Sequence, residues 1–569
     1  MSTNVSKEKR EALVSKIQSI KKFIATAPQD ENTAQLLTYI AEIEKDIKGK
    51  KYGLVFEQHR EAIDEVLENN TPVLTEGKDL FIDNGGQMNF LIEGDNLASL
   101  QLLEKTHKGK IDLIYIDPPY NTGNKDFIYD DSFVDTNDTF RHSKWLSFME
   151  KRLKIAYDLM RESGLILISI NDNELSNLKL LCDTIIGDRN FIENFIWIKN
   201  SGGSLSKTTL TRHEYVLCYA KNIEKAYESS FFFMEKPGYN DVINLLNSYK
   251  NNNGTIDEAK KALSKFYASH SELKGISLYN NIDEHWNIYR ILPITAPNNQ
   301  FYDVLHPTTG KPVKTPPRGW SWSQDTMAKN IACGKVLFGK DETYGIAQKL
   351  LLSEARFEHK RSTYMCDQAE GNKVLQSLIE GVNIFSNPKP VSLIDYLFKN
   401  TAENITILDF FAGSGTTGHA VMKLNAEDGG KRKFILCTNN ENNICRDVTY
   451  ERIKRVIDKE GYKTSLKYFK VNYIPISDKL YYEYADELLK HIKELVELEN
   501  GINFNGNAEI AIILTEEELN EFTESINTEC KAIYLGHDVL PSETQEALFK
   551  AKNIAVNIIP DYYYRALEG

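Results

Sequence analysis

The stretch "IDLIYIDPPY", residues 111 to 120, joins a continuous apolar run to an acid, two prolines and a tyrosine. A run that is apolar at every position, rather than at every second one, is typical of a strand in a parallel sheet covered on both faces. Further strands are predicted at residues 164–170, 404–411 and 433–438, and helices at 144–160, 371–380 and 417–425. This alternation predicts a doubly wound α/β fold in which the acid stands at the carboxyl end of a strand.

Composition narrows the class of protein. The chain has 569 residues, of which 41% are hydrophobic and 26% charged, as in ordinary globular proteins of three or four domains. No apolar run approaches the roughly 18 residues of a membrane helix, and the first residues are charged where a signal peptide would be apolar. We therefore expect a cytoplasmic protein with no membrane contact. The cysteines never form CxxC pairs and the histidines lack metal-ligand spacing, so no metal site is predicted.

The pattern along the chain predicts five regions. Two of them, residues 76–200 and 371–470, carry the strand-and-helix alternation and form the two halves of the α/β core. A turn-rich segment rich in Pro, Gly and Trp, residues 201–370, separates them as an inserted domain. Residues 1–75 read as a helical N-terminal region, and residues 471–569 as a small C-terminal α/β domain.

A glycine-rich loop follows the strand predicted at residues 404–411. In "ILDFFAGSGTTGHAV" (407–421), Gly413, Gly415 and Gly418 have the G-x-G-x-x-G spacing between a strand and a helix. Without Cβ atoms the loop lets a ligand approach the backbone N–H groups at the helix start. Asp409 at the loop entrance and Glu441 after the next strand can accept hydrogen bonds from an amino group and from ribose hydroxyls. The loop predicts a nucleotide-type cofactor, and both NAD and S-adenosylmethionine fit it.

The acid, prolines and tyrosine at 117–120 suit an amine substrate. The exocyclic N6 amine of adenine is a poor nucleophile unless both of its N–H donors find acceptors. Asp117 offers a carboxylate oxygen and Pro118 a carbonyl oxygen, while Pro119 helps to hold the loop extended. Tyr120 can stack on a base, which must first rotate out of the duplex because its amine is otherwise paired. We interpret this stretch as a rigid clamp with two acceptors and an aromatic lid.

Together, "DPPY" (117–120) and "DFFAGSG" (409–415) resemble the amino-group DNA methyltransferases, with the clamp before the cofactor loop as in their circularly permuted beta class. The sequence is most similar to the modification subunits of type III restriction-modification systems, through motifs spread over residues 80–445. These motifs are "LIEGDNLASL" (91–100), "DLIYIDPPYNTG" (112–123), "ISINDNEL" (168–175), "PPRGWSWS" (316–323), "LFGKDET" (337–343) and "FSNPKPVSLI" (385–394).

The resemblance implies a Rossmann-like S-adenosylmethionine-dependent methyltransferase fold, a parallel seven-stranded sheet with one reversed strand. It makes 76–200 the catalytic half, 371–470 the cofactor-binding half and 201–370 the target-recognition domain. It also implies double-stranded DNA as substrate, a homodimer and pairing with an ATP-dependent restriction subunit. The implied catalytic residues are Asp117, Pro118, Pro119 and Tyr120. The implied cofactor residues are Asp409, Phe411, Gly413 and Gly415 at the methionine end, Lys389 and Pro390 nearby, Glu441 on the ribose, and Asp95.

The distribution of charged residues gives only a weak prediction of the surface that binds DNA. The net charge of −13 argues mildly against nucleic acid, but residues 197–215, 310–323 and 354–364 are locally basic. In these runs Lys207 and Arg318 are the candidates for phosphate or base contact. The stretch "GKVLFGKD" (334–341) nearly spells a phosphate-binding loop, but Asp341 replaces the Ser or Thr that would hold magnesium, so no ATP hydrolysis is predicted.

Three other functions compete with adenine-N6 methylation. Cytosine-N4 methylation needs the same amine clamp, although an Asp-headed clamp more often goes with adenine in this family. An NAD-dependent dehydrogenase would leave the Asp-Pro-Pro-Tyr stretch unexplained. A non-catalytic DNA-binding specificity subunit would not need the intact Asp117 and Gly413.

Overall fold

The structure is a computed structural model. It describes residues 5–26, 31–48, 54–123, 128–129, 132–133, 137–200, 204–205, 208–295, 300–379, 385, 387–476, 487–504, 507–536 and 538–559.

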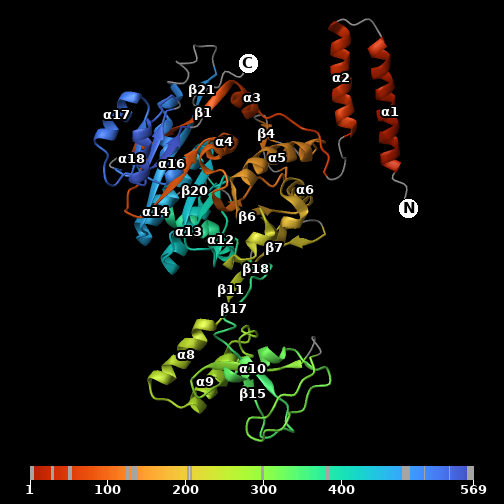
Figure 1. Ribbon diagram of the computed structural model, residues 1–569, viewed down its shortest axis with the longest axis vertical. Helices are drawn as coiled ribbons and strands as arrows, with labels where there is room; N and C mark the ends of the chain where they lie inside the picture. The colour runs from red at the N-terminus through yellow and green to blue at the C-terminus, as the bar shows by residue number, and fades with distance from the viewer. Residues whose placement is uncertain are drawn as a thin grey trace.

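A ten-stranded sheet forms the centre of the molecule (Figure 1). Its strands, in spatial order, are β1 (Asn70–Glu76), β21 (Thr464–Pro475), β2 (Gln87–Glu93), β20 (Lys433–Thr438), β19 (Thr406–Asp409), β3 (Ile111–Ile116), β6 (Met160–Ile170), β10 (His213–Ala220), β7 (Phe191–Lys199) and β18 (Thr363–Cys366). The seven strands from β2 to β7 are parallel except for β10, which runs antiparallel to both neighbours. The expected seven-stranded sheet with one reversed strand is therefore present, and three further strands extend its edges.

Helices cover both faces of this sheet. One face packs on α4 (Asn96–His107), α5 (Arg141–Leu159), α6 (Leu175–Cys182) and α16 (Ile492–Asn500). The other face packs on α11 (Ala369–Leu378), α12 (Val391–Phe398), α13 (Thr416–Asp428) and α14 (Glu451–Glu460). In β3, Ile114 and Ile116 belong to the first core, and Leu113 and Tyr115 to the second. Burial on both sides explains why residues 111–116 are apolar throughout.

The inserted segment forms a separate lobe below the sheet. Two short strands, β11 (Phe233–Glu235) and β17 (Phe357–His359), form the narrow link between them (Figure 1). The lobe contains α8 (Tyr239–Asn251), α9 (Ile256–Ser269), α10 (Gln324–Ala332) and a sheet of β12 (Asn281–Ile282), β13 (Ile288–Pro293), β16 (Ala347–Leu351) and β15 (Val336–Leu337). The predicted insertion, 201–370, is longer than this lobe, because β10 and β18 pair with strands of the central sheet. The apolar residues of β10 are buried in the central sheet. The sequence did not predict this strand as part of the core, because turn-rich segments surround it.

The two ends of the chain differ in structure. The helices α1 (Val5–Thr26) and α2 (Glu31–Lys48) lie side by side, away from the body of the molecule (Figure 1). The region predicted as helical up to residue 75 also contains most of β1, which pairs with β21. Near the C-terminus, β22 (Ile510–Ile513), β23 (Ala532–Leu535) and β24 (Ala555–Ile558) form a parallel sheet with α17 (Glu516–Glu524) and α18 (Glu543–Ala551). Among the described residues, no helix has the length and apolarity needed to cross a membrane.

Candidate active site

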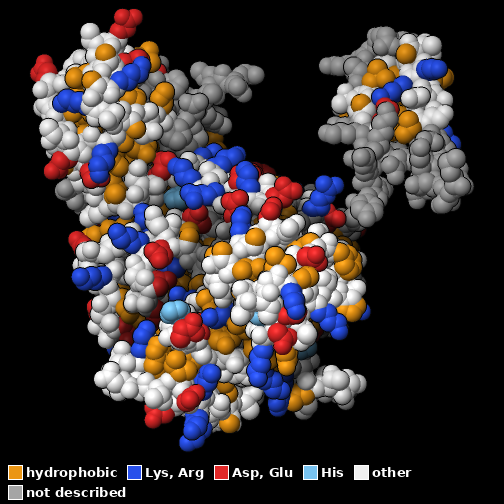
Figure 2. All heavy atoms as spheres, turned by 60° about the horizontal axis from the view of Figure 1, so that its bottom comes forward, with side chains coloured by type: hydrophobic (Ala, Val, Ile, Leu, Met, Phe, Trp, Pro, Cys, Tyr) orange, Lys and Arg blue, Asp and Glu red, His pale blue; other side chains and the backbone are white. Residues whose placement is uncertain are grey.

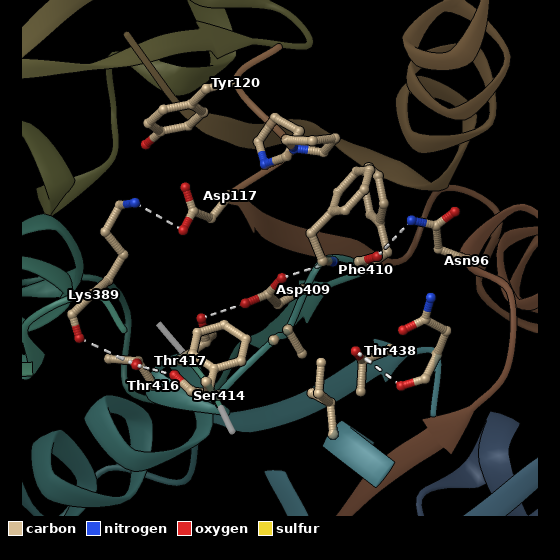
Figure 3. Close-up of a pocket in the computed structure, with 18 of the residues that line it drawn as sticks. Asn96, Asp117, Tyr120, Lys389, Asp409, Phe410, Ser414, Thr416, Thr417 and Thr438 are labelled. Carbon is tan, nitrogen blue, oxygen red and sulfur yellow. Dashed lines mark hydrogen bonds and ion pairs between the residues drawn. The ribbon is translucent and has the colours of Figure 1, made fainter. Parts of the chain in front are cut away.

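The two motifs meet at one edge of the sheet. Strands β19 and β3 are parallel neighbours, with Leu408 opposite Ile114, so Asp409 and Asp117 emerge at the same carboxyl edge. A cavity of about 820 Å³ opens there (Figure 3). Of the residues predicted for catalysis and cofactor binding, only Gly415 and Pro390 do not line it. Those that do are Asp117, Pro118, Pro119, Tyr120, Asp95, Lys389, Asp409, Phe411, Gly413 and Glu441.

Hydrogen bonds from buried side chains fix the loop after β3. The indole nitrogen of Trp145, a fully buried residue of α5, donates a 2.7 Å hydrogen bond to the carbonyl oxygen of Pro119. The Asn121 amide donates to the buried carboxylate of Glu174 at 2.5 Å. Within the described part of the chain, no donor reaches the carbonyl oxygen of Pro118. That oxygen therefore remains an acceptor for a ligand.

The carboxylate of Asp117 has one oxygen engaged and one unpaired. Its Oδ2 accepts a 2.8 Å hydrogen bond from the Lys389 ammonium, 272 residues away in sequence (Figure 3). Its Oδ1 is buried and has no hydrogen-bond partner among the described residues. A buried acceptor without a donor costs free energy, which a donor on a ligand would recover.

Tyr120 lies beside this acceptor and is fixed by a carboxylate that the sequence did not reveal. Its hydroxyl donates to Glu214 of β10 at 3.1 Å, and the Lys389 nitrogen lies 4.9 Å from its ring centroid. Burial, followed by the charges of Asp117 and Glu214, raises the pKa of Tyr120 well above its usual value. Burial alone would raise the pKa of Glu214, but Lys389 and Lys199 together lower it. The tyrosine is therefore neutral and Glu214 is ionised at neutral pH.

The glycine loop owes its shape to two residues in the left-handed region. Gly413 has φ +47° and Gly415 has φ +75°, a conformation that side chains disfavour. A Cβ atom on Gly413 would come within 2.9 Å of the Phe385 ring, and one on Gly415 within 3.1 Å of Thr449. Gly415 thus turns the chain into α13, while Gly413 keeps the cavity wall open.

Asp409 is directed into its own loop. Its carboxylate accepts hydrogen bonds from the Phe411 amide at 3.0 Å and from the Thr417 hydroxyl at 2.5 Å. Burial raises its pKa to about 7. These bonds stabilise the loop, and Asp409 also lines the cavity where the predicted contact with an amino group would be made. Glu441, which follows β20, is exposed and lines the cavity. This is the position that the predicted contact with ribose hydroxyls needs.

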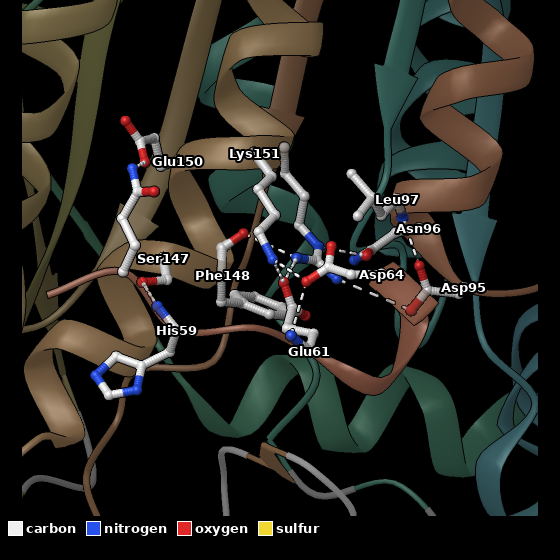
Figure 4. Close-up of polar contacts among 12 residues, drawn as sticks. His59, Glu61, Asp64, Asp95, Asn96, Leu97, Ser147, Phe148, Glu150 and Lys151 are labelled. Carbon is white, nitrogen blue, oxygen red and sulfur yellow. Dashed lines mark hydrogen bonds and ion pairs between the residues drawn. The ribbon is translucent and has the colours of Figure 1, made fainter. Parts of the chain in front are cut away.

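A second wall comes from the segment that precedes α3 (Ala62–Asn69). Glu61 of this segment pairs with the buried guanidinium of Arg152 at 2.9 Å, and Arg152 also donates to Asn96 at 2.6 Å. Figure 4 shows Glu61 and Asp64 facing Lys151 of α5, with Asp95 and Asn96 beside them at the start of α4. Asp95 accepts hydrogen bonds from the backbone amides of residues 97 and 98. Its carboxylate thus caps α4 at the rim of the cavity.

The predicted DNA contacts lie elsewhere or outside the described residues. Arg318 is exposed on the inserted lobe and does not line the cavity. Lys207 lies outside the residues that the structure describes. On the face that carries this lobe, cationic and anionic side chains are interspersed (Figure 2).

Comparison with known proteins identifies the family. The profile of the DNA methylase family matches residues 111–450, which include both motifs and most of the central sheet. The chain belongs to the DNA methylase family.

The relatives of this DNA methylase include a type III Mod subunit and a type II methyltransferase. It is 32% identical over 427 residues to the type III restriction-modification enzyme EcoP15I Mod subunit of Escherichia coli, covering 67% of this chain and 65% of that subunit. It is 32% identical over 360 residues to the type II methyltransferase M.KpnI of Klebsiella pneumoniae, covering 61% of this chain and 79% of the relative. The methylase thus spans less than two thirds of the length of the EcoP15I subunit.

A solved structure, the cytosine-N4-specific PvuII DNA methyltransferase, aligns with 68% of this chain and 98% of its own, at 12% identity and a TM-score of 0.32. The strand order and the family profile, rather than this alignment, carry the fold assignment.

Several residues of the site could not be predicted from sequence. Trp145 reads as one apolar position of an amphipathic helix, and Arg152 as one of many charged residues on the same helix. Glu214 stands at the start of a strand that we had placed in the inserted domain. Only the pairing of β10 with β6 and β7 brings Glu214 to Tyr120.

Proposed function

We propose that this DNA methylase transfers a methyl group from S-adenosylmethionine to the N6 amine of an adenine rotated out of double-stranded DNA. The observation that carries the proposal is the unpaired, buried Oδ1 of Asp117, which lies in the same cavity as Tyr120 and the glycine loop. A buried acceptor at the end of a rigid loop suits an amine donor.

The chain's own residues prepare the amine. Asp117 Oδ1 accepts one N–H and the carbonyl of Pro118 accepts the other, which draws the nitrogen lone pair out of conjugation with the ring. Tyr120, kept neutral and anchored by Glu214, presents its ring for stacking. Trp145 holds the Pro119 carbonyl, so the loop need not reorganise when the base enters.

The cavity suits S-adenosylmethionine in size and chemistry. About 820 Å³ is within the usual range for a cofactor site, roughly 300–1,000 Å³. Gly413 leaves room for the ligand beside Phe385, Phe411 supplies an aromatic face for a cation, and Glu441 can accept from ribose hydroxyls. When bound, the cofactor would supply an electrophilic methyl group on a sulfonium that leaves with the S–C electron pair. Asp117 Oδ1, which accepts an amine N–H, is the group placed to take the proton that the nitrogen would release.

We propose further that the protein is a modification subunit that acts in the cytoplasm as a homodimer, with an ATP-dependent restriction subunit as a partner. The similarity to the EcoP15I Mod subunit supports this assembly. The α1–α2 pair exposes apolar side chains that a partner can cover, among them Phe23, Leu36, Tyr39 and Ile43. Light scattering of the purified chain should give the mass of a dimer, and a monomer at micromolar concentration would contradict it.

The inserted segment, residues 201–370, is the proposed target-recognition domain, with Arg318 and Lys207 as contacts to phosphates or bases. A cationic side chain that neutralises a phosphate releases counterions on binding. Replacing both residues with Ala should weaken DNA binding and reduce its dependence on salt. Unchanged affinity for a methylatable DNA would count against this role.

Labelled S-adenosylmethionine tests the reaction directly. After incubation with unmethylated genomic DNA and digestion to nucleosides, the label should appear in N6-methyl-2′-deoxyadenosine. Label in N4-methyl-2′-deoxycytidine would keep the mechanism and change the base, and no label with cofactor bound would favour a non-catalytic DNA-binding subunit. S-adenosylmethionine, and not NAD, should raise the melting temperature; protection by NAD alone would overturn the proposal.

A further inference from the structure

Three charged side chains from distant segments meet on the base side of the cavity. The Lys389 ammonium lies 2.8 Å from Asp117 Oδ2 and 3.6 Å from Glu214 Oε2. Asp117 follows β3, Lys389 precedes α12, and Glu214 belongs to β10. The side chains of Lys389 and Glu214 are only 12% and 14% exposed. Water therefore screens this ion-paired group little.

The charges of the group are balanced. Glu214 also pairs with Lys199, so two carboxylates meet two ammonium groups. Burial alone would lower the pKa of Lys389, but Asp117 and Glu214 raise it above its usual value. Lys389 therefore remains an ammonium ion, and it can hold Asp117 only by hydrogen bonding and charge.

The group also sets the direction in which the free acceptor points. A carboxylate group is free to rotate about the single bonds of its side chain. A hydrogen bond from a fixed cation to one of its oxygens restricts that rotation. Lys389 engages Oδ2, which leaves Oδ1 as the free oxygen of Asp117 (Figure 3). Glu214 holds both Lys389 and the Tyr120 hydroxyl, so one residue fixes the acceptor and the aromatic ring relative to each other.

We propose that Lys389 and Glu214 are positioning residues for methyl transfer: Glu214 holds the Lys389 ammonium, and Lys389 turns the free oxygen of Asp117 toward the amine. The inference rests on the proposed function, and it changes the role of Lys389 from the cofactor contact that the sequence resemblance implied. In this arrangement Lys389 serves the base, and the cofactor needs no contact with its ammonium.

Replacing the ammonium with a neutral side chain of similar length separates the two roles. We expect Lys389→Met to bind S-adenosylmethionine within about threefold of the unmodified chain, measured by calorimetry. Its single-turnover rate of adenine methylation should fall about 30- to 100-fold, the usual cost of misplacing a reacting group by about 1 Å. Lys389→Arg, which keeps the cation, should recover most of that loss.

The partner residue supplies a second measurement. Glu214→Gln should slow methylation about tenfold, because it removes the charge that holds Lys389 but keeps an acceptor oxygen for the Tyr120 hydroxyl. Lys389→Met/Glu214→Gln should then be no slower than Lys389→Met, since the lost charge acts on Asp117 through Lys389. The matched control is Lys423→Met, which removes a lysine paired with the carboxylates of Asp395 and Glu427 away from the cavity. Its methylation rate should be unchanged, and thermal melts of every variant should confirm folding.

Other outcomes would overturn the inference. A tenfold or larger loss of S-adenosylmethionine affinity in Lys389→Met, with a normal rate at saturation, would return Lys389 to the cofactor. A normal rate with normal affinity would mean that the ion pair does not position Asp117, and additive losses in the double variant would mean that Glu214 acts independently. These results differ from failure of the proposed function, in which the unmodified chain itself labels no adenine.

Discussion

Removing the Asp117 carboxylate tests the centre of the reaction. In Asp117→Ala the amine keeps the Pro118 carbonyl and loses Asp117 Oδ1, the buried oxygen that has no hydrogen-bond partner among the described residues and can accept its second N–H. A hydrogen bond to a charged acceptor contributes about 1.5–3 kcal/mol, so the single-turnover methylation rate should fall at least about 10- to 150-fold. Loss of a nearby group that can accept a proton can add a further factor of about 100 or more.

The same variant should retain its cofactor, because it leaves the glycine loop and Glu441, the lining residues assigned to the cofactor, unchanged. Single-turnover methylation at saturating S-adenosylmethionine measures the rate, and calorimetry measures the affinity. The matched control is Asp172→Ala, which removes an exposed carboxylate after the adjacent strand β6 that does not line the cavity. A fall of less than about threefold in Asp117→Ala, or an equal fall in the control, would refute the assigned role.

Three further predictions concern the loops around the cavity. Gly415→Ala should lower the free energy of unfolding by about 1–2 kcal/mol in urea titrations, because φ is +75° and Thr449 lies 3.1 Å from the added Cβ; an unchanged midpoint would contradict this. Trp145→Phe should cost about 1–3 kcal/mol of stability and slow methylation about tenfold at constant cofactor affinity, since the half-buried Pro119 carbonyl loses its donor. Asp409 has a folded pKa of about 7, above the unfolded value of 3.8, so the folded state binds more protons between these values. The contribution of this group to the free energy of unfolding is complete below pH 4 and falls by about 1.4 kcal/mol per pH unit as the pH rises toward 7. Denaturation at pH 5 and pH 7 measures this pH dependence, and Asp409→Asn should remove it. The same pH dependence in the variant and in the unmodified chain would contradict the assignment.

Local sequence patterns predicted much of the core because each depends on neighbouring residues. The strand at 111–116 and the strand at 433–438 were predicted at their observed bounds, since burial on both faces makes every position apolar. The same reasoning failed for β10, whose apolar residues lie between turn-rich segments and were assigned to the inserted domain.

The sequence by itself determined the chemistry of the two loops and the family. Each of the two motifs lies within a few residues of chain: one is an acid followed by two prolines and a tyrosine, and the other is a set of glycines at fixed spacing after a strand. Each therefore predicts its chemistry without any information on distant residues. Only the tertiary structure decided which other side chains join them. Lys389 reaches Asp117 from 272 residues away, Glu214 of β10 reaches Tyr120 across one intervening strand, β6, and Trp145 reaches Pro119 from a helix. The physical reason is that parallel strands deliver their carboxyl ends to one edge of the sheet, whatever their order in the chain, and no local pattern records which ends become neighbours.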